Sequence, residues 1–193
     1  MSTISPQQVV VGFDFNVTAR AAMAEALALA TREPSRVLHF LCVIDPKTPI
    51  PGIPPFNMID FKYAEQVQQA LTREIQAELA GRQVVGRIHF FVYARIGAAA
   101  EEILALAMEV GADLIVIGGH AHAGEEHVEL GAVAKAVLRD AGCTVEVARP
   151  KAYEHVDLLK VVDAPAHEKY APPHRYSYEE TRMELRPRDW PLF

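Results

Sequence analysis

Two short segments of the chain carry acidic, glycine and histidine residues in an order that suits the binding of a phosphorylated ligand. The first is Gly12-Phe-Asp14, which follows three consecutive valines, and the second runs from Gly118 through Gly124 and on to Gly131. A glycine-bearing loop that opens a helix presents backbone N–H groups to phosphate oxygens. The Asp14 carboxylate could accept a hydrogen bond from a ribose or a base. In the alternative interpretation, Asp14 is a cap or turn residue after a strand.

Three histidines of the second segment, His120, His122 and His127, raise the question of a metal site. Imidazoles bind Zn²⁺, Ni²⁺ and Cu²⁺, but this spacing does not match that of zinc sites. Three alternatives stay open: polar loop residues, replacements for positive charges near a phosphate, and an anion site formed by imidazolium below pH ~6.5. We predict no metal site here.

Residues suited to nucleophilic or acid–base catalysis are few. None of the four serines (2, 5, 35 and 177) falls at a strand-to-helix elbow. Cys42 lies inside an apolar run and Cys143 opens another, and apolar surroundings raise a thiol pKa. We therefore expect no enzyme, while a slow ATPase or a metal-dependent hydrolase that uses the His/Glu loop remains an alternative.

The elements that must position these segments alternate along the chain. Apolar runs predict strands at 8–14, 37–44, 86–95, 112–118 and 143–148, and helices are expected at 21–31, 59–79, 98–110 and 131–141. Asn16 or Thr18 is the expected N-cap of the first helix. This alternation predicts an α/β fold with an open parallel sheet and helices on both faces. Ligands bind such sheets at the switch point, here between the first and fourth strands.

The composition changes after Pro150. Residues 151–193 contain seven Lys or Arg, eight Asp or Glu, five prolines and six aromatic residues. Only 156–162 is an apolar stretch long enough to pair or pack alone. So many aromatic residues are unusual for a solvated disordered tail. We predict a domain over 1–150 and an extended arm over 151–193 that docks on the body or on a dimer partner; the alternative is a mobile tail.

Charge and hydropathy exclude several classes of protein. The net charge of −6 argues against non-specific binding to nucleic acid or to anionic membranes. No apolar stretch approaches the ~20 residues that span a bilayer. The segment 1–8 lacks Lys and Arg, unlike a secretory or transit signal. We therefore expect a cytoplasmic protein with reduced thiols.

Five stretches between residues 7 and 149 form a recognisable set. They are a strand ending in Asp14; His39-Phe-Leu-Cys-Val-Ile-Asp45; Arg95-Ile-Gly-Ala-Ala-Ala-Glu-Glu-Ile103; Ala112-Asp-Leu-Ile-Val-Ile-Gly118; and Leu130-Gly-Ala-Val-Ala-Lys-Ala-Val-Leu138 with Gly142-Cys-Thr-Val-Glu-Val147. Together they resemble the universal stress protein family. The resemblance implies a flavodoxin-like or Rossmann-like sheet of order 3-2-1-4-5. It also implies a non-catalytic stress-response module, AMP or ATP as ligand, and Mg²⁺ only together with the nucleotide.

The resemblance also assigns the site residues. Adenine and ribose contacts would map to Asp14, Val43 and Ile117, and phosphate contacts to Gly118, His120, Ala121, Gly131, Ala132 and Val133.

Two positions depart from the Gly-x2-Gly-x9-Gly-Ser/Thr pattern of the nucleotide-binding members. Ala121 stands at the second Gly and Ala132 at the Ser/Thr, while Glu125, Glu126 and Glu129 lie between them. Losing one hydroxyl contact to a charged group removes roughly 1.5–3 kcal/mol. We expect a degenerate site whose affinity for ATP is reduced more than its affinity for AMP. A genuine ATP or AMP switch remains an alternative.

The fifth expected strand is the candidate interface. An edge strand must be covered or paired, and a twofold dimer would bury residues 144–148. The arm begins immediately afterwards, so we predict a homodimer through this strand and the arm. The other hypothesis is an adaptor whose arm binds a protein partner.

Overall fold

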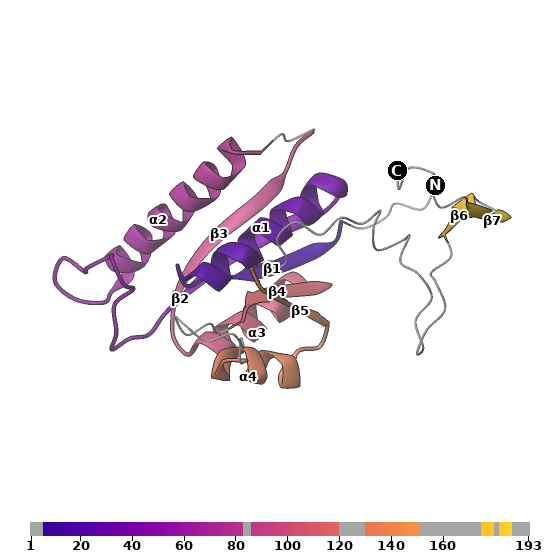
Figure 1. The fold of residues 1–193 in the computed structure, drawn as a ribbon. Helices are drawn as coiled ribbons and strands as arrows, with labels where there is room; N and C mark the ends of the chain where they lie inside the picture. Colours follow the sequence, from indigo (N-terminus) through magenta and orange to yellow (C-terminus); the bar gives the residue numbers. More distant parts are fainter. Residues whose placement is uncertain (1–5, 83–85, 120–129, 151–174, 180–181, 187–193) are drawn as a thin grey trace, which may run out of the picture. The chain divides into compact units, whose positions relative to one another are not determined.

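The computed structural model describes residues 6–82, 86–119, 130–150, 175–179 and 182–186 (Figure 1). Contacts divide the chain into two compact units, Met1–Pro150 and Lys151–Phe193. The first unit contains a five-stranded parallel sheet of order β3-β2-β1-β4-β5, as expected for a flavodoxin-like α/β fold. Its strands are β1 (Gln8–Gly12), β2 (Val37–Ile44), β3 (His89–Ile96), β4 (Leu114–Gly118) and β5 (Thr144–Ala148).

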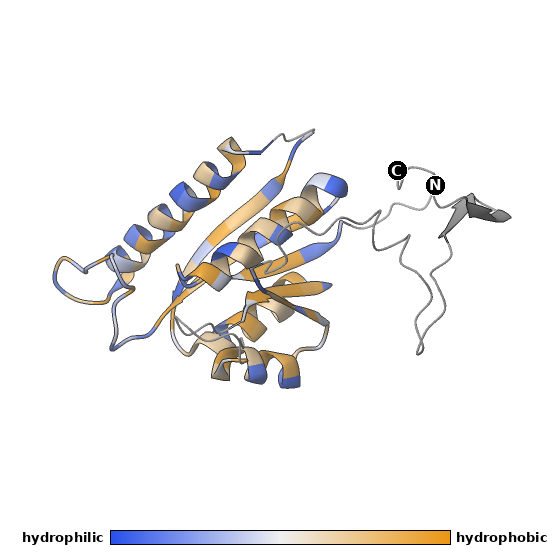
Figure 2. Cartoon of the chain, viewed as in Figure 1, coloured by the Kyte–Doolittle hydropathy of each residue, from blue (hydrophilic) through white to orange (hydrophobic). Residues whose placement is uncertain are grey.

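Four helices connect these strands and cover both faces of the sheet. They are α1 (Val17–Arg32), α2 (Phe61–Ala80), α3 (Ala99–Val110) and α4 (Ala132–Asp140). Helices α1 and α2 pack on one face and α3 and α4 on the other, because the chain reverses its direction across the sheet after β3. The strands consist mainly of hydrophobic residues, whereas hydrophilic residues lie along the outer sides of the helices (Figure 2).

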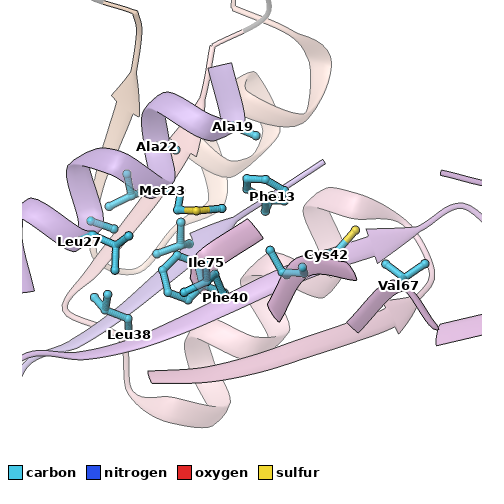
Figure 3. Packing of buried hydrophobic residues seen from close by; sticks show 14 of the residues in the cluster. Phe13, Ala19, Ala22, Met23, Leu27, Leu38, Phe40, Cys42, Val67 and Ile75 are labelled. Carbon is cyan, nitrogen blue, oxygen red and sulfur yellow. The ribbon is translucent and has the colours of Figure 1, made fainter. Parts of the chain in front are cut away.

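The core has two parts, one on each face of the sheet. In β1, Val9 and Val11 belong to the cluster under α1 and α2, whereas Val10 belongs to the cluster under α3 and α4. Successive side chains of a strand point to opposite faces. All three valines are fully buried, because helices cover both faces of the sheet. The first cluster, shown in Figure 3, includes Leu27 and Phe40 among its fully buried members.

Local capping decides where the helices begin and end. Asn16 Oδ1 accepts a hydrogen bond from Ala19 N at 2.8 Å, which makes Asn16 the N-cap of α1. This helix therefore begins at Val17, and the expected start at position 21 was wrong. Asp60 caps α2 in the same way through Tyr63 N at 3.0 Å. Gly111 ends α3 with φ at 63°, a left-handed conformation that a glycine adopts without strain.

The segment 45–55 between β2 and α2 contains five prolines and has no regular secondary structure, because proline lacks the backbone N–H that helices and sheets use. The Tyr63 hydroxyl fastens this loop to α2. It accepts a hydrogen bond from Ile50 N at 2.7 Å and donates one to Ile53 O at 2.7 Å. Because the Tyr63 side chain is buried in the core, the loop is attached firmly to the body.

The second unit contains an antiparallel pair of strands, β6 (Arg175–Glu179) and β7 (Arg182–Arg186). This hairpin was not predicted from the sequence. The apolar stretch 156–162 lies outside the described residues. Docking of the arm on the body or on a partner stays a prediction.

Candidate functional site

A cavity of about 330 Å³ opens at the carboxyl ends of β1 and β4, at the switch point of the sheet. The ends of β1, β2 and β4 and the starts of α1, α3 and α4 contribute its walls. It is lined by Gly12, Phe13, Asp14, Asn16, Thr18, Ala19, Leu41, Val43, Ala99, Ile103, Ile117, Gly118, Gly119, Gly131, Ala132, Val133 and Ala134.

The Asp14 carboxylate is held in this cavity by a tight turn. Its Oδ1 accepts a hydrogen bond from Asn16 N at 3.2 Å and its Oδ2 accepts one from Asn16 Nδ2 at 2.7 Å. Phe15 between them has φ at 64°, a region that costs a non-glycine residue roughly 1–2 kcal/mol. Asn16 Oδ1 also accepts a bond from Thr18 Oγ1 at 2.8 Å. Side-chain bonds therefore fix Asp14 before any ligand arrives.

An apolar part of the lining lies beside this turn. Leu41, Ile103 and Ile117 are buried, and Val43 is half-buried. A Cβ atom on Gly12 would stand 3.0 Å from Ile117 Cγ2 and 3.3 Å from Ile103 Cδ1. The glycine therefore leaves room for these two side chains to meet at the end of β1. The resulting surface suits a flat, weakly polar group.

Gly118 allows the end of β4 to approach the start of α1. A Cβ atom at this position would stand 2.6 Å from the backbone carbon of Thr18 and 2.7 Å from Ala19 N. Backbone atoms cannot yield as a side chain does, so packing alone accounts for a glycine here. Next to it, Gly119 N donates a hydrogen bond to Ala148 O at 3.1 Å and ties the loop to β5.

The N-terminus of α4 forms the opposite wall. Gly131 is its N-cap and, as a glycine, has no side chain to accept the first N–H groups. The residues Ala132, Val133 and Ala134 all line the cavity. The first N–H groups of a helix lack partners within the helix and carry a partial positive charge, so they attract an anion. The cavity thus combines an oriented carboxylate, an apolar wall and an anion-attracting wall.

Seven of the site residues assigned from the sequence line this one cavity: Asp14, Val43, Ile117, Gly118, Gly131, Ala132 and Val133. His120 and Ala121 lie outside the described residues, as do His122 and His127. Whether any of them contacts a ligand stays a prediction.

Sequence reasoning missed several residues of the lining. Leu41 lies two positions before Val43 in the same strand and therefore shares its face, a signal that the sequence carried. Asn16 and Thr18 were predicted only as helix caps. Ile103 comes from α3, which packs on the same face of the sheet as Leu41 and Val43, and no local pattern pointed to it.

The thiols and the strand histidine lack the environment of reactive groups. Burial raises the pKa of the Cys42 thiol to about 12, and the charge of Asp14 adds to this shift. Burial also raises the pKa of Cys143. His39 is buried between Tyr93 Oη at 3.1 Å and Gln8 Oε1 at 2.8 Å, and burial lowers its pKa. Among the described residues, no cluster of three or more His, Cys, Asp or Glu could hold a metal ion.

An open parallel sheet with helices on both faces and a cavity at its switch point defines a doubly wound α/β protein. The universal stress protein family matches residues 6–149, and the chain belongs to this family. No curated protein matches the chain. In the part of the chain that the structure describes, no helix has the length and apolar character to cross a membrane.

Solved structures with the same fold include universal stress proteins. UspA from Lactobacillus plantarum is 22% identical, with a TM-score of 0.54 over 76% of this chain and 100% of its own. A universal stress protein in complex with cAMP is 22% identical, with a TM-score of 0.50 over 76% and 98%. The universal stress protein from Archaeoglobus fulgidus in complex with dAMP is 19% identical, with a TM-score of 0.50 over 76% and 100%.

Proposed function

We propose that this universal stress protein is a non-catalytic regulatory module that binds an adenine mononucleotide in the switch-point cavity. The observation that carries the proposal is that the Asp14 turn and the N-terminus of α4 face one cavity with an apolar wall. Two universal stress proteins of the same fold, one in complex with cAMP and the other with dAMP, support the choice of ligand.

Each part of a mononucleotide has a matching part of the lining. The adenine ring suits the apolar wall of Leu41, Val43 and Ile117. The ribose hydroxyls suit Asp14, because a carboxylate has about four acceptor positions and Asn16 uses only two. The phosphate suits the N–H groups at the start of α4. The cavity of about 330 Å³ lies within the usual range for small-molecule sites.

A triphosphate fits this chain less well than a monophosphate. Ala132, at the start of α4, has no hydroxyl to offer to a terminal phosphate. That loss removes roughly 1.5–3 kcal/mol, or about tenfold to a hundredfold in affinity. Ala121 and the carboxylates of Glu125, Glu126 and Glu129, which lie outside the described residues, add to the expectation from the sequence alone. We therefore propose that AMP binds more tightly than ATP, with Mg²⁺ bound only alongside a nucleotide.

Binding rather than turnover is the function that the lining favours. Among the described lining residues Asp14 is the one ionisable side chain, and its oxygens accept bonds from Asn16. Acid–base catalysis requires a positioned group that gains or loses a proton near the operating pH. A carboxylate engaged in a turn suits ligand recognition instead. A slow ATPase that uses the His/Glu loop remains the alternative, and assay of phosphate release from ATP decides between the two.

Isothermal titration calorimetry with AMP, ADP and ATP, with and without Mg²⁺, tests the proposal. We expect Asp14→Ala to weaken AMP binding at least tenfold. Asp45→Ala is the matched control, because Asp45 also ends a strand and accepts a turn hydrogen bond, from Lys47 N at 2.6 Å, but does not line the cavity. Absence of AMP binding by the wild-type protein would refute the proposal.

Restoring the glycine at position 121 and the hydroxyl at position 132 should strengthen ATP binding. The double variant Ala121→Gly with Ala132→Ser should bind ATP at least tenfold more tightly than the wild type. Ala136→Ser is the control, because it adds the same hydroxyl one turn later in α4, away from the cavity. An equal gain in the control would contradict the assigned role of position 132.

A second function is favoured by the C-terminal part of the chain. We propose a cytoplasmic homodimer through β5 and the arm, and an arm that recognises a protein partner. β5 is an edge strand of the described sheet, and the arm has its own pair of strands. Sedimentation velocity should show a dimer, and deletion of 151–193 should weaken it. A monomer at all concentrations would refute the dimer.

A further inference from the structure

A second cleft, of about 390 Å³, lies between α1, α2 and the proline-rich loop. It is lined by Phe15, Arg20, Pro51, Gly52, Ile53, Ala70, Arg73 and Glu74. None of these residues lines the switch-point cavity, so the two hollows have separate walls.

One side of this cleft is positively charged. Arg20 forms a bidentate ion pair with Glu74, with Nε and Nη2 at 3.2 and 3.0 Å from Oε2. Arg73 contributes a second guanidinium, and within the described residues it makes neither an ion pair nor a side-chain hydrogen bond. The three charged side chains therefore sum to one positive charge. A guanidinium offers five N–H donors in a planar fork that suits a phosphate or a carboxylate.

The other side of the cleft is apolar and well supported. Phe15, Pro51, Ile53 and Ala70 provide ring and aliphatic surface. The loop that carries two of them is fixed to α2, since the Tyr63 hydroxyl bonds to both Ile50 N and Ile53 O. The loop part of the apolar lining is therefore held in place within the same cleft as the guanidinium groups.

We propose that this cleft binds a small anion that carries an apolar ring, with the ring against Phe15 and the loop and the anionic group on Arg73. Phe15 is also the strained residue of the turn whose neighbours, Asp14 and Asn16, line the first cavity. A ligand in the second cleft would therefore bear on the turn that holds Asp14. Binding in the second cleft does not depend on a nucleotide in the first.

Phenyl phosphate and benzoate are the probes, and they separate a phosphate ligand from a carboxylate ligand. Each is titrated into ¹⁵N-labelled full-length protein, with backbone signals assigned. We expect at least one probe to shift the amide signals of Gly52, Ile53 and Ala70, while those of Gly118 and Gly131 stay unchanged. Excess AMP should leave these shifts in place. Shifts at Gly118 and Gly131 that AMP abolishes would place the probe in the first cavity and overturn the proposal.

Two variants with matched controls complete the test. Arg73→Gln should weaken probe binding about fivefold, as for a partly solvated ion pair, whereas Lys62→Gln removes an exposed charge elsewhere on α2 and should have no effect. Ala70→Leu fills the cleft without a change of charge and should abolish probe binding. Gln69→Leu changes the neighbouring exposed residue, which does not line the cleft, and should leave probe binding unchanged. Equal losses in a variant and its control, or no saturable shifts with either probe, would overturn the proposal.

Discussion

Removal of the Tyr63 hydroxyl should lower the free energy of unfolding by a large amount, although it deletes only one oxygen atom. In Tyr63→Phe, the N–H of Ile50 loses its partner, and the buried location gives water poor access. An unsatisfied buried group costs about 1–3 kcal/mol, and loss of the bond to the half-buried Ile53 carbonyl adds about 0.5–1.5 kcal/mol. We therefore expect the free energy of unfolding to fall by about 2–4 kcal/mol, and the melting temperature by about 5–10 °C for a chain of this size.

Urea unfolding at equilibrium measures this loss, and an unchanged m-value shows that it reflects stability. Tyr93→Phe is the control, because the Tyr93 hydroxyl contacts a single partner, His39 Nδ1, at 3.1 Å. It should lose only about 0.5–1.5 kcal/mol. If Tyr63→Phe is no less stable than Tyr93→Phe, the loop is not held by this hydroxyl, and the fixed wall of the second cleft loses its physical basis.

Three further predictions concern packing, pH and thiol chemistry. Gly118→Ala should lower stability by about 1–3 kcal/mol or more, because its Cβ would stand 2.6 Å from the backbone of α1, whereas Gly142→Ala meets nothing within 4 Å and should be neutral by thermal melting. Burial lowers the pKa of His39 from its ordinary value of 6.5, so the unfolded chain binds the extra proton and stability falls as the pH drops below this value; His39→Gln should flatten this decline in urea titrations between about pH 7.5 and 5.5. Because its pKa is raised to about 12, the buried Cys42 thiol should react with Ellman's reagent only after the protein unfolds. The half-buried Cys143 thiol, whose pKa is also raised, should react slowly in the folded protein.

The alternation of strands and helices predicted the sheet because each apolar run is bounded by polar or glycine residues. It could not place the start of α1. Val17 is largely exposed and Thr18 is β-branched, so neither carries the apolar periodicity of a helix. The cap at Asn16, a local hydrogen bond, sets the boundary instead. Local chemistry thus fixed a limit that hydropathy did not mark.

The hairpin of β6 and β7 was missed for a related reason. Its strands do alternate polar residues with tyrosines in β6 and with Met183 and Leu185 in β7, which is the period of a strand. However, Glu180-Thr181 between them is not a glycine-containing pair of the kind that marks two-residue turns. Long-range packing explains the missed part of the cavity. Ile103 reaches the end of β1 only because α3 crosses the sheet, a contact between residues far apart in sequence.

The glycines of the switch point are weak evidence for a nucleotide, since packing explains two of them. Gly118 makes way for the backbone of α1, and Gly12 for Ile103 and Ile117. Both would be needed in a protein whose cavity stayed empty. The proposed nucleotide site rests instead on two features that packing does not require, which are the lack of a capping side chain at Gly131 and the placement of Asp14 in the cavity lining.

Comparison of Asp14 with Asp45 separates the two roles of a carboxylate at a strand end. Each accepts a backbone hydrogen bond from the residue two positions later, Asn16 N at 3.2 Å and Lys47 N at 2.6 Å. Replacing either by Ala removes this backbone bond, at a cost of about 0.5–1.5 kcal/mol in urea titrations, and Asp14→Ala also loses the bond from Asn16 Nδ2. Only Asp14→Ala should weaken AMP binding, because only Asp14 lines the cavity. Equal AMP affinities in the two variants would leave Asp14 as a turn residue and nothing more, and would remove the ribose contact from the proposed site.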